Sequence, residues 1–153
     1  MSKLPNFTCG GSIHIITNNQ VGFTTEPANY RSFRHSADLV KPFEVPIIRV
    51  NTSDPVAVIK ACKFAVKYWK RYRKDVLIDM IGYRFYGHNE VDEPSFTQPK
   101  MYQKIRSMKT PPQQYEQELI NEGLITETEA KGLRKQISEH FENEYQESLK
   151  RSP

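Results

Sequence analysis

The sequence predicts an α/β fold, in which helices flank a parallel sheet and a helical segment follows at the C-terminus. Short segments rich in β-branched residues, typical of strands, recur at residues 12–17, 46–51 and 75–82. A helical pattern separates the second of these segments from the third, and strands that alternate with helices are typical of parallel sheets. We therefore expect an α/β domain over residues 1–99 and a helical extension over residues 100–153.

The helix between the second and third strands is the most clearly marked element. Ser53-Asp54-Pro55 supplies an N-cap and a proline at the first helical position. Apolar residues then recur at helical spacing, at Val58, Cys62, Ala65 and Trp69. The lysines fall on the opposite face, which predicts a helix with one side on the sheet and the other in solvent.

Helix signals continue beyond residue 99. One short helix is marked by Met101, Ile105 and Met108, and another begins at Thr110-Pro111 and ends at Gly123. A capping box at residues 126–129 opens the last helix. Its apolar stripe, which we expect to form a core or an interface, consists of Leu133, Ile137, Phe141, Tyr145 and Leu149.

Charge and composition exclude several classes of protein. The net charge is +4, with +8 over residues 1–74 and −4 over residues 111–153. The basic residues gather on one helix face without interleaved aromatics, so we expect no nucleic-acid partner. No stretch approaches the roughly 20 apolar residues that cross a bilayer, and the first five residues carry no signal or transit pattern. Two isolated cysteines, Cys9 and Cys62, indicate a reducing compartment rather than a disulfide framework.

Two loops follow strands at the sheet edge where α/β proteins bind ligands. The first, residues 18–30, opens with the amides of Asn18 and Asn19, and Gly22 permits a turn that aims the preceding carbonyl at the same point. Neutral oxygens of this kind suit Mg²⁺ bound to a diphosphate. Asparagines also end strands for structural reasons, so this pattern alone leaves both interpretations open.

The second loop, residues 83–99, carries the side chains that could meet an anionic substrate, Arg84 and His88. Three carboxylates follow, at positions 90, 92 and 93. A lone histidine is more often structural than catalytic, but its place on this loop makes the two roles equally favoured for His88. The other three histidines are interpreted as structural.

Five motifs in register give the chain a resemblance to a known family, from about Leu4 to about Gly123. They are Asn-Asn-Gln-Val-Gly-Phe-Thr-Thr (18–25), Val-Asn-x-x-Asp-Pro (50–55), Lys-Asp-Val-x-Ile-Asp (74–79), Tyr-Arg-x-x-Gly-His-Asn-Glu-x-Asp-Glu-Pro (83–94) and Thr-Gln-Pro-x-Met-Tyr-x-x-Ile-Arg (97–106). Together they resemble the thiamine-diphosphate-dependent decarboxylating component of 2-oxoglutarate dehydrogenase and its 2-oxoadipate-acting relative. The resemblance implies part of a thiamine-diphosphate-binding fold.

The resemblance also implies roles for individual residues. Asn19, through its side-chain oxygen, and Val21, through its backbone carbonyl, would be ligands of Mg²⁺ and so bind thiamine diphosphate. His88 would lie on the loop that closes over the cofactor and would assist the reacting groups. The implied substrate is a 2-oxo acid, the implied partner is a lipoyl-bearing acyltransferase, and the parent enzyme would be a homodimer. Its location would be the mitochondrial matrix in a eukaryote or the cytoplasm in a bacterium.

Three departures from the family pattern matter. The family's Gly-Asp motif belongs upstream of the first strand, and its activating glutamate belongs to a downstream half. Within the chain, Lys41-Pro42 lies in a stretch, residues 36–44, that is helical in the family, and we expect the proline to break that helix. The resemblance therefore implies an internal fragment that is inactive by itself. The alternative is a noncatalytic remnant that associates with a full-length dehydrogenase through the sheet edge or the C-terminal helix.

Overall fold

The computed structural model describes residues 4–151, which form two compact units, residues 4–111 and residues 112–151. Residues 1–3, on which the expectation of no targeting pattern partly rests, lie outside the described range. The domain boundary expected after residue 99 stays a prediction.

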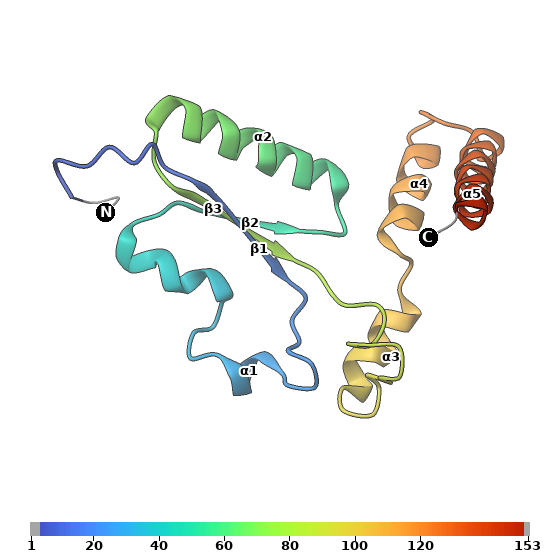
Figure 1. Ribbon diagram of the computed structural model, residues 1–153, viewed down its shortest axis with the longest axis horizontal. Helices are drawn as coiled ribbons and strands as arrows, with labels where there is room; N and C mark the ends of the chain where they lie inside the picture. Colours follow the sequence, from blue (N-terminus) through green and yellow to red (C-terminus); the bar gives the residue numbers. More distant parts are fainter. Residues whose placement is uncertain (1–3, 152–153) are drawn as a thin grey trace. The chain divides into compact units, whose positions relative to one another are not determined.

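A three-stranded parallel sheet forms the centre of the first unit (Figure 1). The strands are β1 (Ile13–Asn18), β2 (Ile47–Asn51) and β3 (Val76–Ile81), in the order β1-β3-β2. The first four residues of β3 are buried, as expected for a central strand that is covered on both faces. The α/β class and all three strands expected from the sequence are thus confirmed.

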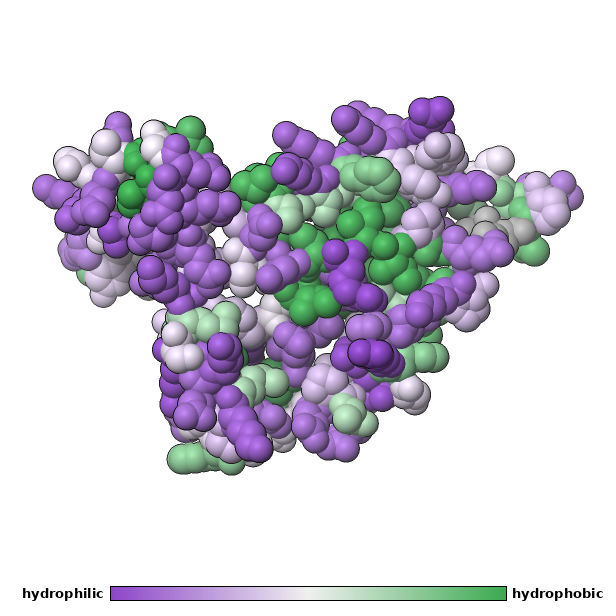
Figure 2. Space-filling model, turned by 180° about the vertical axis from the view of Figure 1, so that it is seen from behind, coloured by the Kyte–Doolittle hydropathy of each residue, from purple (hydrophilic) through white to green (hydrophobic). Residues whose placement is uncertain are grey.

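Helix α2 (Pro55–Tyr72) covers one face of the sheet. It begins where the Asp54 carboxylate accepts a hydrogen bond from the Ala57 amide, at 2.8 Å, as a capping residue should. Ala61 and Ala65 are buried, because small side chains let the helix approach the sheet closely. The lysines of α2 lie on its exposed outer face, and Figure 2 shows polar surface there above an apolar area in the middle of the unit.

A 3-10 helix, η1 (Ser36–Phe43), lies against the opposite face of the sheet, after the short helix α1 (Pro27–Tyr30) (Figure 1). The expectation that Pro42 breaks the helix is wrong, because Pro42 is its penultimate residue. Because Pro42 lies in the last turn, the hydrogen bond that it cannot donate is lost only at the end of the helix. The helix ends at Glu44, in the left-handed conformation with φ 53°.

Helix α3 (Pro99–Ser107) completes the first unit and buries Tyr102 and Ile105. The second unit is a helical hairpin of α4 (Pro111–Asn121) and α5 (Glu127–Lys150). Gly123, with φ 70°, ends α4, and the predicted capping box of Thr126 and Glu129 begins α5. The apolar stripe of α5 is exposed over residues 133–149 rather than forming a core, and its use as an interface stays a prediction.

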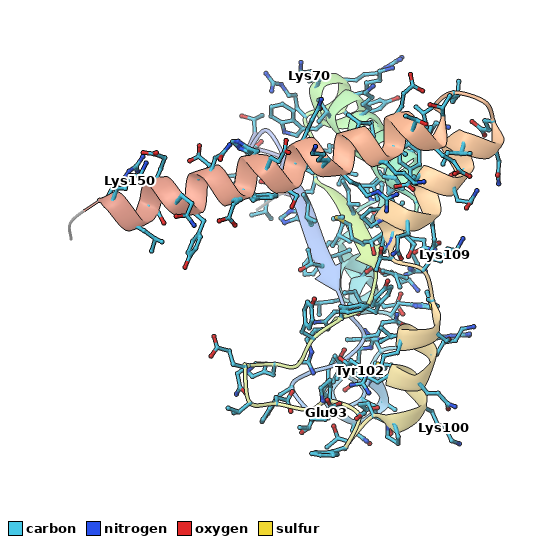
Figure 3. The ribbon with its side chains drawn as sticks, turned by 90° about the vertical axis from the view of Figure 1, so that its right-hand side faces the viewer. Lys70, Glu93, Lys100, Tyr102, Lys109 and Lys150 are labelled. Atoms are coloured by element: carbon cyan, nitrogen blue, oxygen red, sulfur yellow. The ribbon has the colours of Figure 1, made fainter. Side chains whose placement is uncertain are left out.

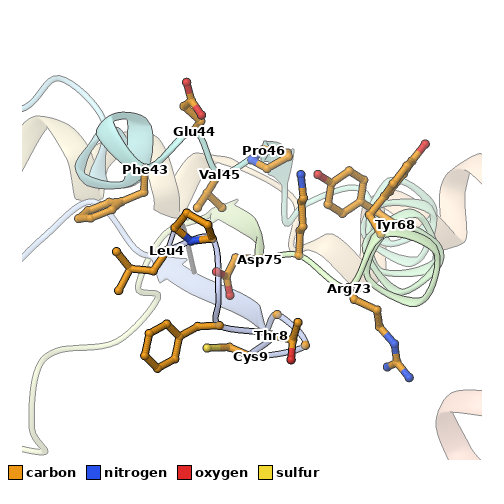
Figure 4. Close-up of a pocket in the computed structure, with 16 residues that line it drawn as sticks. Leu4, Thr8, Cys9, Phe43, Glu44, Val45, Pro46, Tyr68, Arg73 and Asp75 are labelled. Atoms are coloured by element: carbon orange, nitrogen blue, oxygen red, sulfur yellow. The ribbon is translucent and has the colours of Figure 1, made fainter. Parts of the chain in front are cut away.

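A cavity of about 610 Å³ lies at the amino end of the sheet, next to the residues that precede β1 and β3 (Figure 4). Cys9 is on its wall and exposed, whereas Cys62 of α2 is half-buried, and both are free thiols. Within residues 4–151, no helix is both long and apolar enough to cross a membrane.

Candidate functional site

The carboxyl ends of the three strands are tied together at one level. Asn18 of β1 and Asn51 of β2 both pair with Ile81 of β3. Beyond this register, the Gly82 amide donates to the Asn18 carbonyl and the Thr52 amide donates to the Ile81 carbonyl, each at 2.9 Å. Both loops singled out in the sequence therefore start from strand ends that are hydrogen-bonded to one another.

Two side-chain-capped turns shape the first loop. The Asn18 Oδ1 accepts from the Gln20 amide at 3.1 Å, and the Asn19 Oδ1 accepts from the Val21 amide at 3.2 Å. The Gln20 side chain in turn donates to the Gly82 carbonyl, at 2.8 Å, which joins this loop to the start of the second. The Val21 side chain is buried.

Gly22 does not adopt the left-handed conformation that glycine permits. The left-handed residues of this loop are Gln20, with φ 63°, and Phe23, with φ 54°, whereas Gly22 makes two backbone hydrogen bonds with Thr25, each 2.8 Å long. A Cβ at position 22 would lie 3.3 Å from the Tyr30 ring, a tight contact with an exposed side chain.

Asn19 lies at the meeting point of two hollows at the ends of the strands. The smaller, of about 190 Å³, is also lined by Thr17, Asn18, Thr52, Met80, Gly82 and Tyr83. The larger, of about 630 Å³, extends along β2 to helix α3 and includes Arg49 and Lys104 in its lining but no carboxylate. Asn19 is half-buried and lines both.

The second loop folds back onto the first through Arg84 and His88. The Arg84 Nη2 donates to the Phe23 carbonyl at 3.0 Å and lies 3.7 Å from the Asp92 carboxylate. The His88 ring packs on the Phe23 ring with 4.7 Å between centroids, and the His88 amide donates to Asp92 at 2.8 Å. Arg84 is thus engaged within the protein, whereas its sequence position suggested contact with a substrate.

Helix α3 and the residue that precedes it make hydrogen bonds to both loops. The Tyr102 hydroxyl donates to the Arg84 carbonyl at 2.9 Å, and Gln98, which precedes the helix, donates to the Thr24 carbonyl at 3.1 Å. Glu93 is fixed by Ser95 and by Arg106, whose Nη2 lies 2.7 Å away. In Figure 3, Tyr102 is labelled on this helix and Glu93 on the loop that precedes it. The Ser95 hydrogen bonds, and then Arg106, lower the pKa of Glu93 to about 2.

This lowered pKa predicts an acid-sensitive loop. The ordinary pKa of 4.5 applies in the unfolded chain, so the carboxylate stabilises the folded state fully above about pH 4.5 and loses this effect as the pH falls toward 2. The Glu93→Gln variant should therefore be less stable than the wild type above pH 4.5, and the difference should shrink at lower pH. Urea unfolding between pH 2 and 7 measures this difference. Glu90→Gln, which leaves Ser95 and Arg106 untouched, is the control, and a pH-independent Glu93→Gln difference would contradict the prediction.

The structure joins the predicted site residues only in part. His88 contacts Phe23, two residues after Val21, but His88 is not part of the lining of either hollow that Asn19 lines. Among residues 4–151, no three histidine, cysteine or acidic side chains gather as a metal cluster. Sequence reasoning missed Asp92 as the link between Arg84 and His88, because its partners are identified only when the loop is folded.

The chain matches one protein family and is similar to several of its members. The model of a family described as dehydrogenase E1 component matches residues 1–152. The chain is 48% identical over 146 residues to the 2-oxoglutarate dehydrogenase E1 component of Bacillus subtilis (strain 168), a match that covers 95% of this chain and 16% of that protein. It is 45% identical over 157 residues to the probable 2-oxoadipate dehydrogenase complex component E1 homolog of Dictyostelium discoideum, covering 100% and 17%.

A third relative extends the comparison to an organelle. The 2-oxoglutarate dehydrogenase, mitochondrial, of Dictyostelium discoideum is 39% identical over 153 residues, a match that covers 100% of this chain and 15% of that protein. The chain therefore spans about one sixth of the length of the curated relatives it matches.

Proposed function

Because this chain belongs to the dehydrogenase E1 component family, we propose that it forms part of a 2-oxo acid dehydrogenase of the 2-oxoglutarate type. The proposed reaction is oxidative decarboxylation of a 2-oxo acid, with acyl transfer to the lipoyl group of an acyltransferase partner. The parent enzyme is proposed to be a homodimer, in the mitochondrial matrix of a eukaryote or the cytoplasm of a bacterium. The names of the relatives support the substrate class, and the name of one of them includes the word mitochondrial.

One observation carries the proposal: Asn19, which is half-buried, lines two hollows at the carboxyl ends of the strands. An amide oxygen has two acceptor sites, and the hydrogen bond from the Val21 amide uses one of them. The Asn19 oxygen therefore fits a cation ligand without loss of the turn it stabilises. We assign Mg²⁺ and thiamine diphosphate to Asn19 and to the Val21 carbonyl, because a hard cation takes neutral oxygens together with phosphate and water.

The roles proposed for the chain's own residues are binding and orientation. When bound, thiamine diphosphate supplies the electron sink for the loss of carbon dioxide. Asn19 and Val21 would hold the metal, while His88 would hold or move a proton at one of its ring nitrogens. Arg84, with a side chain only 16% exposed, would keep the two loops together and exclude water.

Binding of thiamine diphosphate to the full 153-residue chain, followed by calorimetry with and without Mg²⁺, tests the proposal. We expect weak, Mg²⁺-dependent binding, since Asn19 and Val21 bring no negative charge to the metal. Asn19→Ala should lower the affinity about tenfold or more, because loss of even a group that only supports a metal ligand costs about 10–100-fold in affinity. Asn29→Ala, which removes an exposed amide of α1, is the matched control and should leave the affinity unchanged.

Three other outcomes would each contradict one part of the proposal. Equal affinity of the wild type and Asn19→Ala would overturn the assignment of the metal site. Turnover of 2-oxoglutarate by the chain alone would overturn its expected inactivity. A chain that binds no cofactor but co-purifies with a complete 2-oxoglutarate dehydrogenase would have the noncatalytic role instead.

A further inference from the structure

We infer that Asp92 is a positioning residue, whose carboxylate holds the His88 ring against Phe23 by binding both the His88 backbone and Arg84. The inference deepens the proposed function and rests on it, because it concerns how His88 reaches the loop that carries Asn19 and Val21. Asp92 itself is given no contact with the reacting groups.

One atom makes both contacts. The Asp92 Oδ2 accepts the hydrogen bond from the His88 amide at 2.8 Å and also lies 3.7 Å from the Arg84 Nη2. The two charged side chains are only 15% and 16% exposed, so water screens their attraction less than it does for a surface pair. Loss of this oxygen would release His88 and Arg84 together.

Arg84 links Asp92 to Phe23 of the first loop. The same Nη2 atom that faces Asp92 donates to the Phe23 carbonyl at 3.0 Å. Phe23 has φ 54°, a left-handed conformation that a non-glycine residue keeps only where its surroundings hold it. Asp92 therefore holds the His88 backbone directly and the Phe23 backbone through Arg84.

The second loop is shaped for this contact. The Asp92 amide donates to the Asn89 carbonyl at 3.2 Å, and the Asn89 side chain accepts from the Val91 amide at 3.2 Å, so residues 89–92 form a tight turn. A Cβ at Gly87 would overlap the carbonyl oxygen of Asp92, so the chain can fold back here only at a glycine. The turn thus brings the Asp92 carboxylate to the His88 amide, four residues earlier.

The ring contact is the measurable result. With centroids 4.7 Å apart, the protons of His88 and Phe23 are close enough for nuclear Overhauser cross-peaks. Neither ring is buried, since both residues are exposed, so general burial does not force the rings together. The backbone contacts through Asp92 and Arg84 account for the ring contact.

The experiment compares these cross-peaks in the full chain and in three variants, with no Mg²⁺ or cofactor added. Asp92→Ala removes both contacts, and we expect the His88–Phe23 cross-peaks to be lost. Asp92→Asn keeps an acceptor for the His88 amide but not the charge beside Arg84, and the cross-peaks should weaken. Glu90→Ala, an exposed carboxylate of the same loop with no ion pair in residues 4–151, is the control and should leave them unchanged.

Unchanged cross-peaks in a folded Asp92→Ala chain would overturn the inference. If Asp92→Ala does not fold, Asp92→Asn decides, because weakened cross-peaks support the inference and wild-type cross-peaks contradict it. The measurement needs no cofactor, so its failure is distinct from that of the proposed function, which is judged by Mg²⁺-dependent binding of thiamine diphosphate.

Discussion

Replacement of Arg49 by alanine should lower the free energy of unfolding by about 3 kcal/mol, the lower end of the range for breaking a buried ion pair. Arg49 and Asp79 are directly opposite each other on β2 and β3, and the Arg49 Nε lies 3.0 Å from the Asp79 Oδ2. Asp79 is completely buried, and its Oδ1 has no hydrogen-bond partner among the described residues. The variant therefore leaves a charge in the sheet with no compensation.

The lower end of the range applies because the Arg49 side chain is 36% exposed, so water already screens part of the pair. Urea unfolding measures the effect, with Lys63→Ala, an exposed cation of α2, as the control. The double variant Arg49→Leu with Asp79→Leu should recover most of the loss, since apolar pairs often replace buried ion pairs at little cost. A loss for Arg49→Ala no larger than for Lys63→Ala would show that the pair contributes nothing.

Replacement of Gly82 by alanine should lower the free energy of unfolding by about 1–3 kcal/mol, as overpacking does in tightly packed regions. A Cβ at position 82 would overlap the Oγ1 of Thr52. That hydroxyl donates to the Ile81 carbonyl at 3.1 Å, so it cannot move away without loss of a hydrogen bond. The Gln20 side chain joins the two loops through the Gly82 carbonyl, so the proposed binding of thiamine diphosphate should also weaken.

A second substitution tests this cause. Thr52→Ala removes the overlapping hydroxyl, and the nearest remaining Thr52 atom, its Cβ, would be an ordinary 3.5 Å away. Gly82→Ala should therefore cost less in the Thr52→Ala background than in the wild type, and urea unfolding of the four chains gives the difference. Equal costs in both backgrounds would mean that the hydroxyl is not what excludes a side chain at position 82.

The sheet and its covering helix could be predicted because their causes are local. The strands are marked by β-branched segments, and α2 by the cap at Asp54 and by apolar residues at helical spacing. Pro42 misled the prediction because proline is incompatible with the α-helix, while a 3-10 helix that ends one residue later tolerates it. The stripe on α5 correctly marked a helix, but periodicity does not say what covers the apolar face, and over the described residues the stripe is exposed.

The candidate site could be located from the sequence but not assembled. The two loops were found because ligands bind at the carboxyl ends of parallel strands, and the structure joins them there. The contacts that join them connect residues far apart in the chain, such as Arg84 and Phe23, which are 61 positions apart. No pattern along the chain distinguishes an arginine that binds a carbonyl from one that binds a substrate. The same holds for Asp92, whose neighbours Glu90 and Glu93 offer the same carboxylate chemistry.

The position of β1 in the sheet has a practical consequence. Within residues 4–151 the strand pairs on one side only, with β3, and Ile15 in its middle is 56% exposed. The amide and carbonyl groups on its outer side can pair with another extended segment, and the exposed Ile15 side chain favours such association. Concentrated solutions of this chain should therefore self-associate by strand addition. Ile15→Lys would place a charge on this edge strand, and it should improve solubility without altering the pairing with β3.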